Sequence, residues 1–303
     1  MIRSFVIAAV SIFVIASGVM SGCASAPQNS YAAQRRAMTE RGARPSGGEL
    51  SDWLDTTSKR RSKGLFRFGA YDPHRAAVIF IHGINGAPAD FKWLISQLDT
   101  TAIQPWVYAY SSHKDLADSA DSLFKALCDE QVRTGPLSVI LVGYSIGGLV
   151  ARDVALHAHD DSSCARVPTL ITLSTPWNGH QGAAWSFPFT SLFPASWGDL
   201  IPGSVYLKHL FVRGSLQERS LQETAHFLLF SYGRPAGFGR SGDGVVSVAS
   251  QLFNDAQRQA AGVYGFNLSH DDMLQDATVV RTVENLLASP DPNAHAGLYG
   301  SNR

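Results

Sequence analysis

Residues 141–152, LVGYSIGGLVAR, join an apolar run to a serine that is framed by glycines and followed by a helix-like sequence. Gly143–Gly147 fit the pattern G-x-S-x-G, in which a serine sits on a sharp turn between a strand and a helix. Three fixed positions recur easily by chance in a chain with 27 glycines, so the match alone is a weak signal. The rest of the chain must decide whether Ser145 is a nucleophile or a small residue in a bend.

The surrounding sequence predicts strands alternating with helices from residue 76 onward. Continuous apolar runs, typical of strands buried on both faces, occur at 76–83, 137–144 and 167–175, with further strand-like segments at 104–110, 226–232 and 262–266. Helices are expected near 88–98, 115–132, 145–159 and 271–288. This alternation predicts an α/β fold with a mostly parallel sheet and helices on both faces.

The alternation stops in an aromatic and Pro/Gly-rich segment, for which we predict a cap or lid insertion near 177–213. Its aromatic residues, among them Trp177, Trp185 and Phe187, are expected to bind substrate by lining an acyl pocket. Packing of the insertion on the core is the alternative, and both roles are compatible.

Ser145 lies where nucleophilic chemistry requires it, between a buried strand and a helix. A serine needs a general base, and the base needs an acid that orients it. His270 follows a strand and precedes the last helix, so it is the predicted base; a helix-capping surface histidine is the alternative. Asp243, between two glycines, is the predicted acid; a turn aspartate is the alternative, and Asp199 is the second choice for the acid.

The segment IHGINGAP, residues 81–88, places a His-Gly pair directly after the first buried strand. Acyl transfer needs two N–H donors aimed at the tetrahedral oxygen, each worth about 3–4 kcal/mol. We assign this oxyanion hole to the backbones of Ile84 and Ile146. His82 is expected to orient the loop through hydrogen bonds, and neither a metal site nor a cofactor is predicted.

These motifs together resemble the α/β-hydrolase superfamily over residues 76–288. HGINGAP, GYSIGGLVAR, LSTPWNGH, IPGSVYLKHL, GDGVVSV and SHDDML stand in the order of that family and are most similar to triacylglycerol lipases and GPI inositol-deacylase-like proteins. The resemblance implies the α/β-hydrolase fold and a triad of Ser145, Asp243 and His270. It further implies a serine hydrolase of lipase or esterase type that cleaves carboxylic esters through an acyl-enzyme. An acyltransferase with the same triad and a non-catalytic lipoprotein that binds through this fold are the alternatives.

The N-terminal sequence MIRSFVIAAVSIFVIASGVMSGC predicts a lipoprotein signal peptide over residues 1–22, followed by lipidation of Cys23. An ordinary signal peptide with a chance cysteine and an uncleaved anchor helix are the alternatives. Ala24 follows the cysteine in place of the aspartate that retains lipoproteins in the inner membrane. The expected location is therefore that of an exported bacterial lipoprotein, anchored in the outer membrane on its periplasmic or surface side.

Residues 23–75 are expected to form a tether and lead-in, 76–288 the hydrolase domain and 289–303 a disordered tail. The formal net charge is zero and the pI is about 7.2, so nothing indicates nucleic-acid binding. The expected partners are an ester or lipid substrate and a membrane at the lipid anchor, for a monomeric protein. Export permits a disulfide between Cys128 and Cys164, and two separate buried thiols are the alternative.

Overall fold

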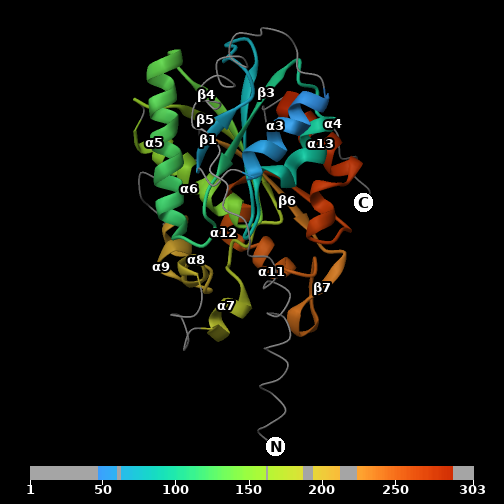
Figure 1. Cartoon of the computed structure of the whole chain (residues 1–303). Helices are drawn as coiled ribbons and strands as arrows, with labels where there is room; N and C mark the ends of the chain where they lie inside the picture. The colour runs from blue at the N-terminus through green and yellow to red at the C-terminus, as the bar shows by residue number, and fades with distance from the viewer. Residues whose placement is uncertain (1–46, 60–62, 162, 187–193, 212–223, 289–303) are drawn as a thin grey trace, which may run out of the picture. The chain divides into compact units, whose positions relative to one another are not determined.

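The computed structural model describes residues 47–59, 63–161, 163–186, 194–211 and 224–288 (Figure 1). All of them lie in one unit, Arg41–Arg303. The predicted signal peptide, the predicted lipidation site Cys23, Phe187 and the predicted tail lie outside the described residues. The strands are β1 (Gly64–Arg67), β2 (Ala76–Ile81), β3 (Ile103–Ala109), β4 (Ser138–Tyr144), β5 (Arg166–Leu173), β6 (Ala225–Ser231), β7 (Arg234–Ala236), β8 (Arg240–Gly242) and β9 (Ala260–Phe266).

Seven of these strands form one sheet in the order β1-β3-β2-β4-β5-β6-β9. All neighbouring pairs run parallel except β1 with β3, which is antiparallel. Strands β7 and β8 form a separate antiparallel pair. The mostly parallel sheet confirms the predicted fold class. The edge strand β1 lies within residues 23–75, so the expected lead-in contributes to the sheet.

The helices connect and cover these strands. They are α3 (Gly47–Lys59), α4 (Lys92–Gln97), α5 (Leu116–Thr134), α6 (Ile146–Asp160), α7 (Gln181–Ser186), α8 (Ala195–Asp199), α9 (Val205–His209), α11 (Val248–Gln251), α12 (Asn254–Gln259) and α13 (Ala277–Ala288), with 3₁₀ segments at Pro88–Phe91, Gly237–Gly239 and Asp271–Leu274. Three short helices, α7 to α9, fall in the predicted insertion. Within the ranges given above, no helix combines the length and apolar character needed to cross a membrane.

The side chains of β2 alternate between two hydrophobic clusters, one on each face of the sheet. Ile79 and Ile81 pack in the cluster that includes α5 and α6, whereas Val78 and Phe80 pack in the cluster that includes α3, α4 and α13. Figure 1 shows these two groups of helices on opposite sides of the strands. Because both faces are covered, the central strands are largely apolar, and the polar side chains that they carry, such as Thr169, Thr172 and His226, are buried.

The prediction of a single helix over 271–288 is wrong in one respect, because the chain forms two separate elements there. A 3₁₀ turn, Asp271–Leu274, is followed by α13, which begins only at Ala277. The carboxylate of Asp276 accepts hydrogen bonds from the N–H groups of Thr278 (2.7 Å) and Val279 (3.2 Å), as a helix-capping aspartate does. Because of this break, the 3₁₀ turn that directly follows His270 is separate from α13.

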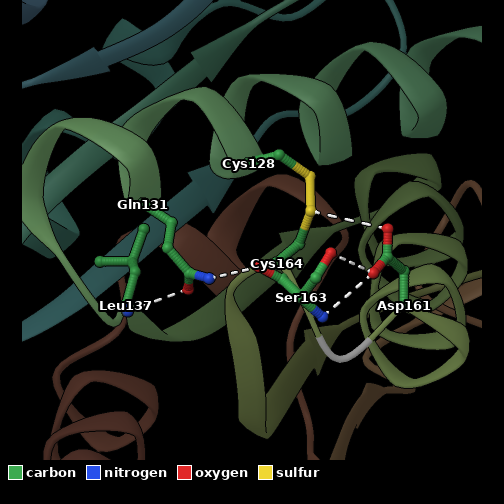
Figure 2. The surroundings of a disulfide bond; sticks show 6 residues. All are labelled: Cys128, Gln131, Leu137, Asp161, Ser163 and Cys164. Carbon is green, nitrogen blue, oxygen red and sulfur yellow. Dashed lines mark hydrogen bonds between the residues drawn. A yellow bond between two sulfur atoms is a disulfide. The ribbon is translucent and has the colours of Figure 1, made fainter.

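A disulfide joins Cys128 of α5 to Cys164 in the loop between α6 and β5, with the two Cα atoms 4.7 Å apart (Figure 2). Of the two alternatives left open by the sequence, the structure has the bridge. The side chain of Gln131 lies beside it, donating to the carbonyl of Ser163 (2.5 Å) and accepting from the N–H of Leu137 (3.1 Å). The bridge therefore fixes the end of α6 that is remote from Ser145.

Removing this bridge is expected to destabilise the folded unit. The cysteines are 36 residues apart, and closing a loop of that length in the unfolded chain is worth about 4 kcal/mol. For a domain of this size we expect the Tm of the Cys128→Ala/Cys164→Ala variant to fall by about 8–16 °C, as measured by calorimetry. Reductant should lower the wild-type Tm similarly and leave the variant unaffected; equal Tm values for the two proteins would show that the bridge does not stabilise the fold.

Candidate active site

Ser145 occupies the turn between β4 and α6 with φ 54° and ψ −129°. A non-glycine residue in the left-handed region costs about 1–3 kcal/mol and persists only where its surroundings hold it. Here the Ser145 N–H donates to the carbonyl of Leu173 at 2.8 Å. A Cβ at Gly147 would lie 2.1 Å from the carbonyl oxygen of Ile81, and one at Gly143 would lie 2.5 Å from the backbone of α6. The turn therefore needs glycine on both sides of the serine, as the sequence pattern predicts.

Asp243 and His270 are joined by a hydrogen bond of 2.7 Å between His270 Nδ1 and Asp243 Oδ2. The His270 backbone N–H also donates to the carbonyl of Asp243, at 2.8 Å. Both side chains are buried. Asp199, the second choice for the acid, has a different role, because its Oδ2 accepts from the N–H of Leu116 at the start of α5 (2.8 Å).

The carboxylate of Asp243 is surrounded by donors. Besides His270, it accepts hydrogen bonds from the N–H groups of Val245 (2.9 Å) and Val246 (2.7 Å), the Ser231 hydroxyl (2.8 Å) and the Gln251 amide (3.1 Å). Burial alone would raise the pKa of Asp243, but the hydrogen bond and charge of His270 and the two N–H groups outweigh it and lower that pKa. An ionised carboxylate can accept all of these bonds, so Asp243 is held as an anion.

Tyr144 connects the turn to His270. The two ring centroids are 4.9 Å apart, and the Tyr144 hydroxyl donates to the His270 carbonyl at 3.1 Å. A Cβ placed on Gly83 would lie 3.3 Å from the Tyr144 ring and 3.0 Å from the Ser145 Cβ. The His-Gly loop, Ser145 and His270 therefore meet around one aromatic ring. Among the described residues no hydrogen bond joins the Ser145 hydroxyl to another group; catalytic hydrogen bonds often tighten only when substrate binds.

The predicted oxyanion donors are both available. The N–H groups of Ile84 and Ile146 donate no hydrogen bond within the described part of the chain. Ile146 is the first residue of α6, where N–H groups have no acceptor inside the helix and the helix dipole favours negative charge. Gly83, next to Ile84, lies against Ser145. Ile146 thus directly follows Ser145, and Ile84 is one residue from a glycine that lies against it; the oxyanion hole at their N–H groups stays a prediction.

His82 is held as a neutral ring beneath this loop. Its Nε2 accepts the N–H of Tyr110 at 3.4 Å, its Nδ1 lies 2.9 Å from the carbonyl of Gly83, and its ring stacks on Tyr110 with centroids 4.4 Å apart. Burial lowers the pKa of His82 to about 4, and the hydrogen bond to Gly83 opposes this only in part. These contacts fit the predicted role of orienting the loop. In the described ranges no group of His, Cys, Asp or Glu side chains is arranged to hold a metal ion.

The buried His82 makes folding stability pH-dependent. Between pH 6.5 and about 4 the unfolded chain protonates this ring while the folded protein does not. Its contribution is therefore complete above pH 6.5 and decreases as the pH falls, by about 3 kcal/mol at pH 4. The His82→Gln variant keeps an acceptor for Tyr110 and should flatten the dependence of the unfolding free energy by up to about 1.4 kcal/mol per pH unit in urea titrations. His226, whose pKa burial also lowers, leaves a residual slope in both proteins; identical slopes would exclude His82 as a contributor.

Of the predicted substrate-binding residues, Trp177 is described and is 1% exposed. Its ring makes edge contacts with Phe211 and His226 and lies 5.8 Å from the guanidinium of Arg152 on α6. It also lines a cavity of about 270 Å³ that none of Ser145, Asp243 or His270 lines. Substrate binding by Trp177 stays a prediction. The side chain of Trp185 and all of Phe187 lie outside the described residues.

The side chains that support Asp243 and His270 were not predicted from the sequence. Ser231 ends the apolar run of β6, and a polar residue at the carboxyl end of a buried strand is a usable signal. Gln251 and Tyr144 offer no local pattern, because their partners lie 8 and 126 residues away in the chain.

Comparisons with known proteins agree with this architecture. Residues 102–187 match the PGAP1-like alpha/beta domain family. No curated protein matches the sequence.

Several solved structures resemble the chain more widely. The mature lipase BlEst2 of Bacillus licheniformis is 20% identical, with a TM-score of 0.54, over 71% of this chain and 93% of that one. Lipase B of Aspergillus fumigatus is 12% identical, with a TM-score of 0.55, over 85% and 66% of the two chains. The lin2722 product of Listeria innocua is 13% identical, with a TM-score of 0.50, over 76% and 96%. The chain has the α/β-hydrolase fold.

Proposed function

We propose that the protein is a serine hydrolase that cleaves carboxylic esters through an acyl-enzyme on Ser145. The buried hydrogen bond between Asp243 and His270, beside the strained turn that carries Ser145, is the observation on which the proposal rests. The likeness in fold to proteins named as lipases supports an ester or lipid as the substrate class.

The mechanism follows from the donors and acceptors around His270. Because Asp243 accepts from His270 Nδ1, the neutral ring carries its proton there and presents Nε2 as an acceptor. Nε2 takes the Ser145 proton as the oxygen attacks the ester carbonyl, and Asp243 stabilises the imidazolium that forms. The N–H groups of Ile84 and Ile146 stabilise the tetrahedral oxyanion. His270 then protonates the leaving alcohol, which leaves the acyl-enzyme. Water attacks the acyl carbonyl while His270 Nε2 takes its proton, and His270 returns that proton to the Ser145 oxygen as the acid is released.

Labelling with a fluorophosphonate probe, followed by peptide mapping, tests this proposal. We expect the probe to modify Ser145 and to abolish turnover of p-nitrophenyl esters. Ser174 is an internal control, because it too has a left-handed φ (50°) but its hydroxyl is bonded to Ser231 at 2.6 Å. A protein that is neither labelled at Ser145 nor active on esters of graded chain length contradicts the proposal. Transfer of the acyl group to an added alcohol, with little free acid, would indicate an acyltransferase.

We further propose that the chain is an exported lipoprotein anchored through Cys23. The disulfide between Cys128 and Cys164 supports export, because such bonds persist in oxidising compartments. Palmitate labelling and membrane fractionation of the wild type and the Cys23→Ala variant test the anchor. Label and membrane association that survive the substitution would contradict it.

A further inference from the structure

Two residues that follow β3, Ser112 and His113, connect the His-Gly loop to the insertion. We call them the bridge residues, and we call residues 82–86 the oxyanion loop. Ser112 is buried, and its Oγ accepts the N–H of Asn85 at 2.8 Å. Its carbonyl accepts the hydroxyl of Ser196 on α8 at 2.6 Å.

His113 repeats the same division between side chain and backbone. Its ring Nε2 lies 2.5 Å from the Asn85 Oδ1, and its carbonyl accepts the N–H of Ala195 at 3.1 Å. Both bridge residues therefore touch the oxyanion loop with their side chains and the first residues of α8 with their backbones. The oxyanion loop and the start of α8 are therefore joined through two adjacent residues.

The segment they hold is a tight turn that contains Ile84. The N–H of Gly86 donates to the carbonyl of Gly83 at 3.2 Å, which closes a four-residue turn with Ile84 and Asn85 at its centre. Asn85 has a φ of 54°, and a positive φ at the third position is typical of a type II turn. Asparagine adopts this conformation more readily than other residues with a side chain, but at a cost that glycine does not have.

This conformational cost favours a flip of the central peptide, the one between Ile84 and Asn85. The type I alternative turns the peptide between Ile84 and Asn85 over and returns Asn85 to a negative φ. That peptide carries the N–H that Ser112 accepts. The flip itself leaves the Ile84 N–H in place, because that N–H belongs to the preceding peptide. It does break the backbone bond to Ser112 that holds the turn, and the turn that carries Ile84 is then free to shift. The Ser112 hydroxyl opposes this flip.

We propose that Ser112 is a positioning residue that holds Ile84 in the geometry required for the oxyanion, and that Ser196 of the insertion sustains it through the Ser112 carbonyl. The inference rests on the proposed function. It assigns the insertion a part in transition-state stabilisation that is separate from contact with substrate.

Kinetics of the full chain with a p-nitrophenyl ester, normalised to sites titrated with fluorophosphonate, test this proposal. We expect Ser112→Ala to lower kcat by about 10- to 100-fold with KM within about threefold, because an oxyanion contact acts only in the transition state. Affinity for an alkyl boronic acid should fall in parallel. Ser196→Ala keeps the Ser112 hydroxyl and should lower kcat less, by about 3- to 10-fold. Ser111→Ala, which alters the preceding residue, should leave kcat unchanged.

Rescue separates positioning from a general loss of folding. Asn85→Gly removes the strain that favours the flip, so adding it to Ser112→Ala should restore part of kcat. A Ser112→Ala enzyme with wild-type kcat and boronate affinity overturns the inference, as does a loss confined to the number of titratable sites. Should Ser112→Ala fail to fold, an unchanged kcat in Ser196→Ala overturns the link to the insertion. A wild type that is neither labelled nor active instead contradicts the proposed function.

Discussion

Replacing Ser145 by alanine is expected to lower kcat for ester hydrolysis by about 10⁴–10⁶-fold. The substitution removes the attacking oxygen and leaves the turn, the Asp243–His270 pair and the two N–H donors in place. The measurement is turnover of a p-nitrophenyl ester by purified wild type and variant. Residual activity within tenfold of the wild type would exclude Ser145 as the nucleophile.

A second substitution at the same position provides a structural control. Glycine adopts a φ of 54° without strain, so Ser145→Gly should be as inactive as Ser145→Ala but more stable, by about 1 kcal/mol. Urea unfolding of the two variants measures this difference. Equal loss of activity with the opposite order of stability would show that the turn relaxes once the serine is removed.

Asp243→Asn is expected to lower kcat by about 10³–10⁴-fold. The substitution exchanges an acceptor-only group for one that carries two donor hydrogens in a site that supplies five donors. An amide nitrogen facing His270 favours the tautomer with its proton on Nε2, which cannot accept the proton of Ser145.

Ser231→Ala is the matched control for this substitution. It removes one donor to Asp243 Oδ2 but leaves the charge and the bond to His270, so kcat should stay within about tenfold of the wild type. Comparison of the two variants on one ester, at saturating substrate, tests the assignment. An Asp243→Asn enzyme as active as Ser231→Ala would remove Asp243 from the catalytic group.

The sequence predicted most of the sheet because its central strands are buried on both faces and therefore read as continuous apolar runs. Strand β1 was not predicted, because it has only four residues and all of them are half-buried at the edge of the sheet. Helix α3 carried a usable signal: Leu50, Trp53 and Leu54 are buried at helical spacing. The prediction nevertheless placed it in the tether and lead-in of residues 23–75.

Within the candidate site, Asp243 and His270 could be predicted because each follows a strand. The order along the chain in α/β-hydrolases, serine, then aspartate or glutamate, then histidine, limits the choices further. The residues that support the site through contacts distant in sequence could not be predicted. Ser112, for example, acts on a residue 27 positions earlier and on one 84 positions later, and no local pattern encodes either distance. Contacts of this kind, within the site and beside it, depend on the packing of the complete fold.

Helix α6 begins one residue after Ser145 and ends four residues before Cys164. The helix that follows the proposed nucleophile is thus held by hydrogen bonds at one end and by a disulfide at the other. In surroundings that reduce disulfides the bond between Cys128 and Cys164 is lost, while the hydrogen bonds at the Ser145 end of α6 remain. The reduced protein would then turn over substrate normally at low temperature and would inactivate sooner on heating. The redox state of its surroundings would therefore determine how long the protein stays active.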